Sequence, residues 1–152
     1  MKNFLVLLFL AALLIVSAPQ FSAAQNKSVW VSPRTGVWQL TGKDDENINW
    51  TGQIIFTGKT YSKNSIVRYK GYIVWSSPDD ESSGREYFTG TFDRRTGKLV
   101  LKGTSLKIES GDLALGIYTG FVNQKGRQIS RGSWDGVDVV KGKWSAKWLK
   151  LR

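Results

Sequence analysis

Two of the side chains that carry much of protein chemistry are missing from this sequence. The chain of 152 residues contains no cysteine and no histidine. Without cysteine there can be no disulfide bond and no thiol nucleophile. Without histidine the commonest general base and the commonest metal ligand are also missing. Packing and hydrogen bonding must therefore stabilise the fold.

Other catalytic and cofactor patterns are absent as well. The chain has no G-x-S-x-G nucleophile motif and no phosphate-binding glycine loop, and its acidic turns lack the spacing of an EF-hand. A glycosidase needs two carboxylates that face each other. Glu86 has inward parity in its expected strand, whereas Asp93 has the opposite parity in the same strand. We therefore expect a protein that is not an enzyme and that uses no cofactor and no metal.

A long apolar run occurs only at the N-terminus. Lys2 precedes an unbroken apolar stretch from Phe4 to Val16, and Ser22-Ala23-Ala24 has the small residues of a cleavage site. This pattern predicts a secretory signal peptide that is cleaved before Gln25. The alternative, a retained anchor, is disfavoured because a spanning helix needs about 20 apolar residues. We expect a secreted or periplasmic protein.

The remaining chain is long enough for one domain with one core. We divide the sequence into a signal peptide (1–24), a lead-in segment (25–35) and a single β domain (36–152).

Alternating apolar residues with regularly placed glycines dominate the β domain. In the stretch from Arg85 to Gly103, Phe88, Gly90 and Phe92 share one face, and Asp93–Gly97 has the composition of a tight turn. The same alternation predicts eight strands, near 36–42, 48–57, 66–76, 85–92, 98–108, 113–122, 130–134 and 140–148. Eight short strands joined by short turns predict an all-β, eight-stranded antiparallel up-and-down barrel, with a sandwich as the alternative. Glycines on the inward parity favour the barrel, since they permit a tightly coiled, closed sheet.

The charges sort by sign when the turns are assigned to the two ends of such a barrel. The turns after the odd-numbered strands hold Asp44, Asp45, Glu46, Asp79, Asp80, Glu81, Glu109, Asp112, Asp135 and Asp138. The opposite end holds Arg34, Lys59, Lys63, Arg94, Arg95, Lys98, Lys125, Arg127, Lys147, Lys150 and Arg152. We therefore expect an acidic mouth and a basic end. Charge in solvated turns is ordinary, but its segregation by sign produces a field that can steer a partner.

Seven tryptophans are the other unusual feature. The simplest interpretation is that inward aromatic side chains fill the barrel, as in many small barrels. The functional interpretation is an aromatic-lined interior that binds a small ligand, with Glu86, Ser105 and Ser130 as converging polar groups. A buried Glu86 needs a partner, which we expect to be a hydroxyl, an indole or a ligand. The expected lining residues are Trp50, Tyr69, Trp75, Glu86, Phe88, Tyr118, Trp134 and Trp144.

Gly36-Val37-Trp38 opens the first expected strand. This G-x-W placement before an eight-strand pattern resembles the calycin barrels, the lipocalins and avidins. The resemblance implies that the first strand starts at the closed end, that the acidic end is the open mouth, and that a basic residue covers Trp38. The candidates for that residue are Lys141, Lys143 and Lys147.

The chain also departs from both calycin families. Gln39-Leu-Thr-Gly-Lys43 stands where avidins have their Asn-x-x-Gly-Ser ligand motif, and the T-D-Y motif of lipocalins is absent. The resemblance therefore implies neither biotin nor a lipid as the ligand. A cationic or neutral ligand is favoured by the acidic mouth.

Two functions follow from these patterns. The first is an exported binding protein that takes a small molecule or glycan into its interior. The alternative is a filled barrel that acts through its surface as an inhibitor or interaction protein, with the basic end resting on an anionic cell surface. We do not expect nucleic acid as the partner of an exported protein, although basic, aromatic-rich barrels can bind single strands. The sequence leaves the oligomeric state open.

Overall fold

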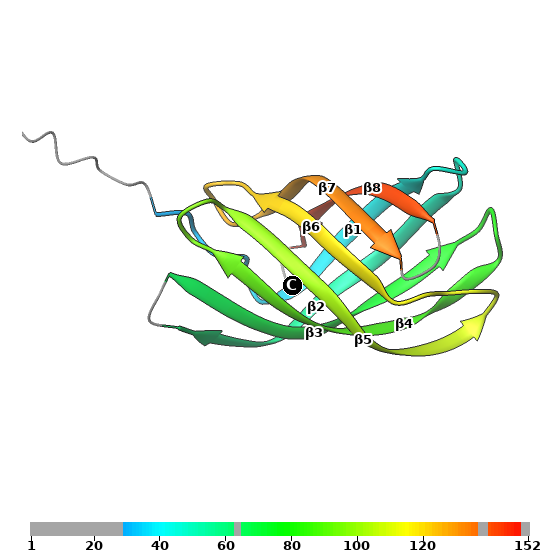
Figure 1. Cartoon of the computed structure of the whole chain (residues 1–152), viewed down its shortest axis with the longest axis horizontal. Coiled ribbons are helices and arrows are strands. Elements are labelled where there is room, and N and C mark those ends of the chain that lie inside the picture. Colours follow the sequence, from blue (N-terminus) through cyan, green and yellow to red (C-terminus); the bar gives the residue numbers. More distant parts are fainter. Residues whose placement is uncertain (1–28, 63–64, 137–139, 150–152) are drawn as a thin grey trace, which may run out of the picture.

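The computed structural model describes residues 29–62, 65–136 and 140–149, and these form one closed β-barrel (Figure 1). Each strand pairs in antiparallel fashion with the next, and β8 closes the sheet on β1. This confirms the predicted eight-stranded antiparallel fold, while the predicted signal peptide lies outside the described residues. In the described part of the chain, no helix is long and apolar enough to cross a membrane. The strands are β1 (Gly36–Asp44), β2 (Asn49–Tyr61), β3 (Ile66–Ser77), β4 (Ser82–Asp93), β5 (Lys98–Ser110), β6 (Gly116–Val122), β7 (Gln128–Gly136) and β8 (Lys141–Trp148).

The inward face of each strand carries the apolar side chains that the alternation predicted. Trp38, Leu40 and Ile54 are fully buried, as are Phe92 and Leu101 beside the β4–β5 turn. Inward glycines allow neighbouring strands to approach and coil. A Cβ atom at Gly71 would overlap the carbonyl oxygen of Ile55 on β2. A side chain at this position would therefore separate β2 from β3.

Two β-bulges change which face the later residues occupy. The register of β4 and β5 shifts between Tyr87 and Phe88, so Ser105 lies opposite Tyr87 and is exposed. A second shift places Ser130 opposite Phe121 on the outer face. The prediction that these two serines point inward is therefore wrong. A bulge inserts one extra residue and reverses the alternation beyond it, which a strict two-residue period cannot anticipate.

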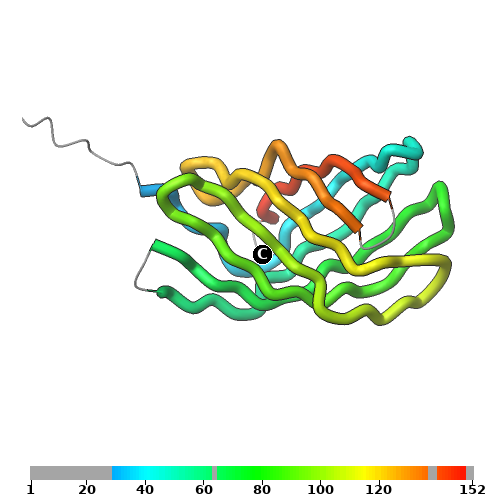
Figure 2. Tube along the Cα trace, in the orientation of Figure 1, coloured from blue at the N-terminus to red at the C-terminus, as the bar shows by residue number. Residues whose placement is uncertain are grey.

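The segment before β1 closes one end of the barrel (Figure 2). The backbone N–H of Trp30 donates to the carbonyl oxygen of Arg94, in the β4–β5 turn, at 2.8 Å. The Trp30 ring covers Gly97, where an added Cβ would lie 2.8 Å from the ring. The buried hydroxyl of Tyr69 donates to the carbonyl oxygen of Pro33 at 2.9 Å. The first strand thus begins at the closed end, as the calycin resemblance implies.

The basic residue expected over Trp38 is not a lysine of β8. Trp38 is fully buried, and its Nε1–H donates to the carbonyl oxygen of Arg34 at 2.9 Å. The guanidinium of Arg34 lies 5.0 Å from the centre of the Trp148 ring instead. The three lysines proposed for this role are exposed on the outward parity of β8, namely Lys141, Lys143 and Lys147. That part of the expectation is wrong, because the alternation of β8 directs its tryptophans inward and its lysines to solvent.

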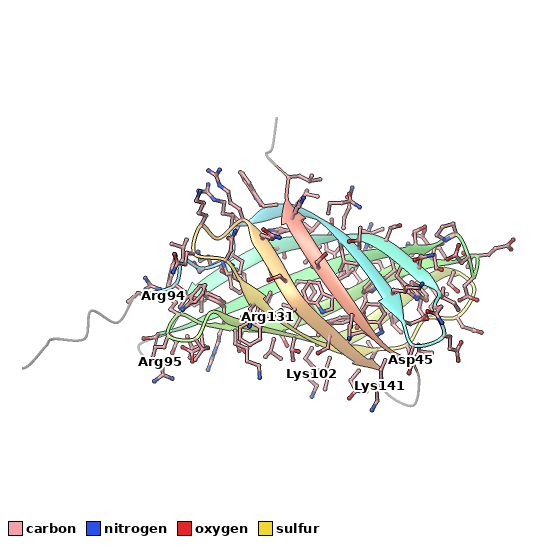
Figure 3. All side chains as sticks on the ribbon, turned by 90° about the horizontal axis from the view of Figure 1, so that it is seen from above. Asp45, Arg94, Arg95, Lys102, Arg131 and Lys141 are labelled. Carbon is pink, nitrogen blue, oxygen red and sulfur yellow. The ribbon has the colours of Figure 1, made fainter. Side chains whose placement is uncertain are left out.

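The up-and-down topology brings the turns after β1, β3, β5 and β7 to one end, which we call the acidic mouth, and the other turns to the basic end. Arg94 and Arg95 lie at the basic end and Asp45 lies at the opposite end (Figure 3). Lys141 also lies near the mouth, on the outer wall, where its Nζ is 3.9 Å from a carboxylate oxygen of Asp135. Four of the charges assigned from the sequence lie outside the described residues: Lys63, Asp138, Lys150 and Arg152.

Candidate functional site

A pocket of about 190 Å³ lies at the acidic mouth. Its lining combines large aromatic side chains with carboxylates. The aromatic members, which we call the aromatic floor, are Trp50, Trp75, Tyr118 and Trp134. The acidic members, which we call the rim carboxylates, are Asp44, Glu46, Asp80 and Asp112.

Trp75 is the centre of the aromatic floor. Its ring centroid lies 6.0 Å from that of Trp50, 6.1 Å from that of Trp134 and 5.7 Å from that of Tyr118. Trp50 and Trp134 meet Trp75 edge to face, an arrangement that aromatic quadrupoles favour. These contacts come from four different strands, β2, β3, β6 and β7, so closure of the barrel is what assembles the floor.

Glu86 on β4 is fully buried and forms hydrogen bonds with two side chains of this floor. Its Oε2 accepts hydrogen bonds from the Nε1–H of Trp75 at 3.1 Å and from the hydroxyl of Tyr118. Its Oε1 accepts the backbone N–H of Gly116 at 2.8 Å. The partner of Glu86 is thus both an indole and a hydroxyl, two of the types that the sequence predicted. One carboxyl group thereby orients two of the four floor rings.

Burial sets the protonation of this network. Removal from water raises the pKa of Glu86, although the hydrogen bonds from Tyr118, Gly116 and Trp75 oppose the rise. Burial also raises the pKa of Tyr118 well above its ordinary value, and the nearby Glu86 carboxylate raises it further. The phenol is therefore a permanent donor at neutral pH. Both groups serve as fixed supports of the floor.

Gly116 joins this network because β6 begins at that residue, three positions later than predicted. The preceding residues Leu113 and Ala114 line the pocket. Leu113 also packs against Gly84, where an added Cβ would lie 2.7 Å from a Leu113 methyl carbon. Two of the three residues by which the predicted strand begins too early therefore line the mouth pocket.

The β1–β2 turn positions one side of the rim. Asp44 is only 6% exposed, and its Oδ1 accepts the backbone N–H groups of Glu46 at 3.0 Å and Ile48 at 2.8 Å. Its Oδ2 accepts the Nε1–H of Trp50 at 2.8 Å. The same carboxylate therefore shapes the turn and holds the indole of Trp50 at the pocket wall.

A serine links the turns on the other side of the rim. The hydroxyl of Ser82 donates to Oδ2 of Asp80 at 2.7 Å and accepts the backbone N–H of Asp112 at 3.1 Å. These bonds tie the β3–β4 turn to the β5–β6 turn. Asp80 and Asp112 are thus held at neighbouring positions of the rim.

The pocket includes half of the residues predicted to line the interior. Trp50, Trp75, Tyr118 and Trp134 line it, and Glu86 lies behind them. The other three belong to the packed core. Phe88 and Tyr69 pack on Phe56, with ring centroids 5.7 and 4.8 Å away. Trp144 donates its Nε1–H to the carbonyl oxygen of Ser133 at 3.1 Å.

The rim carboxylates were not predicted as lining residues, although a signal for them existed. Sorting the turns by end placed Asp44, Glu46, Asp80 and Asp112 together at the mouth. These side chains approach the lumen because of the hydrogen bonds within the turns and those of Ser82. The alternation of residues along the strands does not predict such bonds. In the described ranges, no three carboxylates are grouped closely enough to hold a metal ion. The rim oxygens therefore form no preassembled metal cage there.

Comparison with models of protein families finds no match, and comparison with curated proteins finds no significantly similar chain.

Proposed function

We propose that this is an exported, non-enzymatic binding protein that holds a small ligand or glycan in the pocket at the acidic mouth. The observation that carries the proposal is an open pocket of about 190 Å³ whose aromatic floor is held in place by the buried Glu86. A concave site with many aromatic side chains and a few oriented polar groups is the usual form of a small-molecule site. The signal-like N-terminus supports export to a secreted or periplasmic location.

The arrangement also supports a calycin-like relationship. A closed eight-stranded antiparallel barrel with Gly36-Val37-Trp38 at its closed end is compatible with that fold. In such a barrel the plugged end, here residues 29–35, leaves only the opposite end for ligand entry. The pocket opens at that opposite end.

Native mass spectrometry of the protein purified from its natural source tests the proposal directly. A discrete added mass that is lost on denaturation is the expected result. Trp50→Phe shortens a half-buried side chain of the aromatic floor, and the matched change Trp148→Phe acts on a half-buried tryptophan at the opposite end. We expect the added mass to be reduced in Trp50→Phe and retained in Trp148→Phe. A bare wild-type mass would contradict the proposal.

The basic end provides a second candidate function, attachment to an anionic cell surface. A broad groove at that end is lined by Arg34, Lys59 and Arg94 together with the rings of Tyr61 and Trp148. Cations beside an exposed tyrosine ring and a half-buried tryptophan ring suit a surface rich in phosphate. No carboxylate lines this groove in the described part of the chain.

Vesicle binding separates this second function from the first. Phosphatidylglycerol–phosphatidylcholine vesicles should sediment with the protein at low salt, and vesicles of phosphatidylcholine alone should not. Arg94→Gln should weaken this binding, while the matched change Lys141→Gln near the mouth should affect it less (Figure 3). Equal losses from both substitutions would indicate a response to net charge only.

A further inference from the structure

We infer that the ligand of the mouth pocket is an organic cation, an ammonium group that carries apolar substituents. This inference rests on the proposed function and specifies its ligand. The chain has 22 lysines and arginines against 12 aspartates and glutamates. Among the described residues that line the pocket, however, four are carboxylates and none is a lysine or arginine. Although the protein is basic overall, the charged side chains that line this pocket are all acidic among the described residues.

The negative charge of the rim is not neutralised by neighbouring bases. The two ion pairs among the described residues join Arg95 to Asp93 at the basic end and Lys141 to Asp135 on the outer wall. Neither includes a residue of the pocket. Carboxylates that share a partly enclosed space without a counter-ion produce a negative potential that attracts a cation.

Simple solvation of the turns does not account for this distribution. The mouth also carries basic residues, Lys43, Lys141 and Lys143, but all three are exposed on the outer parity of their strands. Asp44 on β1 is buried next to Lys43 and faces the pocket. On β1, the basic side chain of Lys43 therefore lies on the outer wall, and the acidic side chain of the adjacent Asp44 faces the lumen. Solvation alone would not bury the carboxylate of Asp44 at the pocket.

The aromatic floor favours an organic cation over a metal ion. Trp50, Trp75 and Trp134 line the pocket, and tryptophan is the strongest cation–π partner among the side chains. A hard metal ion prefers a shell of several oxygen ligands. The described rim does not group three such side chains for one ion. An alkylated ammonium has a weaker hydration shell and apolar carbons, so rings and carboxylates together suit it.

Choline and its neutral isostere 3,3-dimethyl-1-butanol provide the test, with binding measured by isothermal titration calorimetry on the full protein. Choline should bind at least about tenfold more tightly than the alcohol at low salt. The difference should shrink as salt screens the rim charges. Asp112→Asn should weaken choline binding several-fold and leave the alcohol unchanged. Asp135→Asn removes the same charge from the outer wall of the same end and should change neither affinity.

The possible outcomes separate the two proposals. Equal affinities for the two isosteres would overturn the cation inference while the binding function stands. Saturable binding of neither compound, together with an added mass in the native spectrum, would also overturn only the cation inference. An Asp135→Asn loss as large as that of Asp112→Asn would attribute the preference to overall charge and would likewise overturn it. A bare native mass would instead remove the proposed function.

Discussion

Replacing Glu86 by glutamine tests whether the floor of the pocket depends on a buried carboxyl group whose pKa is raised by burial. In the wild type, Glu86 accepts three hydrogen bonds, from Trp75, Tyr118 and Gly116. Glutamine has only one acceptor oxygen. If this oxygen faces Gly116, the Trp75 indole loses its partner, and if it faces Trp75 and Tyr118, the Gly116 N–H meets an amide N–H₂. One buried donor is left unpaired in either case, at a cost of about 1–3 kcal/mol.

The cost should depend on pH, and the sign follows from the raised pKa of Glu86. The ordinary pKa of glutamate is 4.5, and burial raises the value in the folded protein. Between the two values the folded state retains a proton that the unfolded state has released, so the stability of the wild type falls as pH rises. Glutamine does not titrate. The free energy of unfolding of the wild type should therefore exceed that of Glu86→Gln most at acid pH, and the difference should narrow by roughly 1.4 kcal/mol for each unit of pKa shift.

Urea unfolding followed by tryptophan fluorescence, repeated from pH 4 to pH 8, measures this difference. The pKa values of Asp79 and Asp93 are lowered by backbone N–H donors, and these groups titrate equally in both proteins. Their contribution therefore cancels in the difference. A gap that stays constant or widens with pH would refute the reasoning, because it would show that the pKa of Glu86 is not raised by folding.

The packing of the barrel leads to three further expectations. Gly103→Ala places a Cβ onto Oε1 of Glu86 and should lower the free energy of unfolding by about 1–3 kcal/mol, measured by thermal or urea unfolding. The control Gly58→Ala should be nearly neutral, because the atom nearest to its added Cβ is 3.8 Å away. Equal effects of the two substitutions would contradict the predicted clash at Gly103. Trp75→Ala should cost roughly 3–5 kcal/mol, since it empties the centre of the floor, and a loss under 1 kcal/mol would show that the site collapses. Trp30→Ala should cost about 1–3 kcal/mol, because a half-buried indole leaves the closed end; unchanged stability would mean that the segment before β1 is not part of the folded unit.

Much of the fold was readable from local pattern. The alternation around Phe88, Gly90 and Phe92 predicted both a strand and its inward face, because a side-chain period of two is imposed by the backbone itself. Turn residues such as Asp93–Gly97 marked the ends of strands through their own conformational preferences. The inward parity of Glu86 followed from the same period. The acidic and basic ends followed from counting turns once eight strands were assigned.

Local pattern was therefore enough to predict the eight strands, the faces of most of them and the segregation of charge. Which inward residues line an open pocket and which fill the core depends on how the closed sheet packs. Ser105 and Ser130 were misplaced because bulges depend on the register between strands. Residues 29–35 close one end because their donors and acceptors meet groups that are distant in sequence. Local periodicity fixes the direction of a side chain relative to its own strand, whereas a pocket is the space left between strands, and only closure of the sheet defines that space.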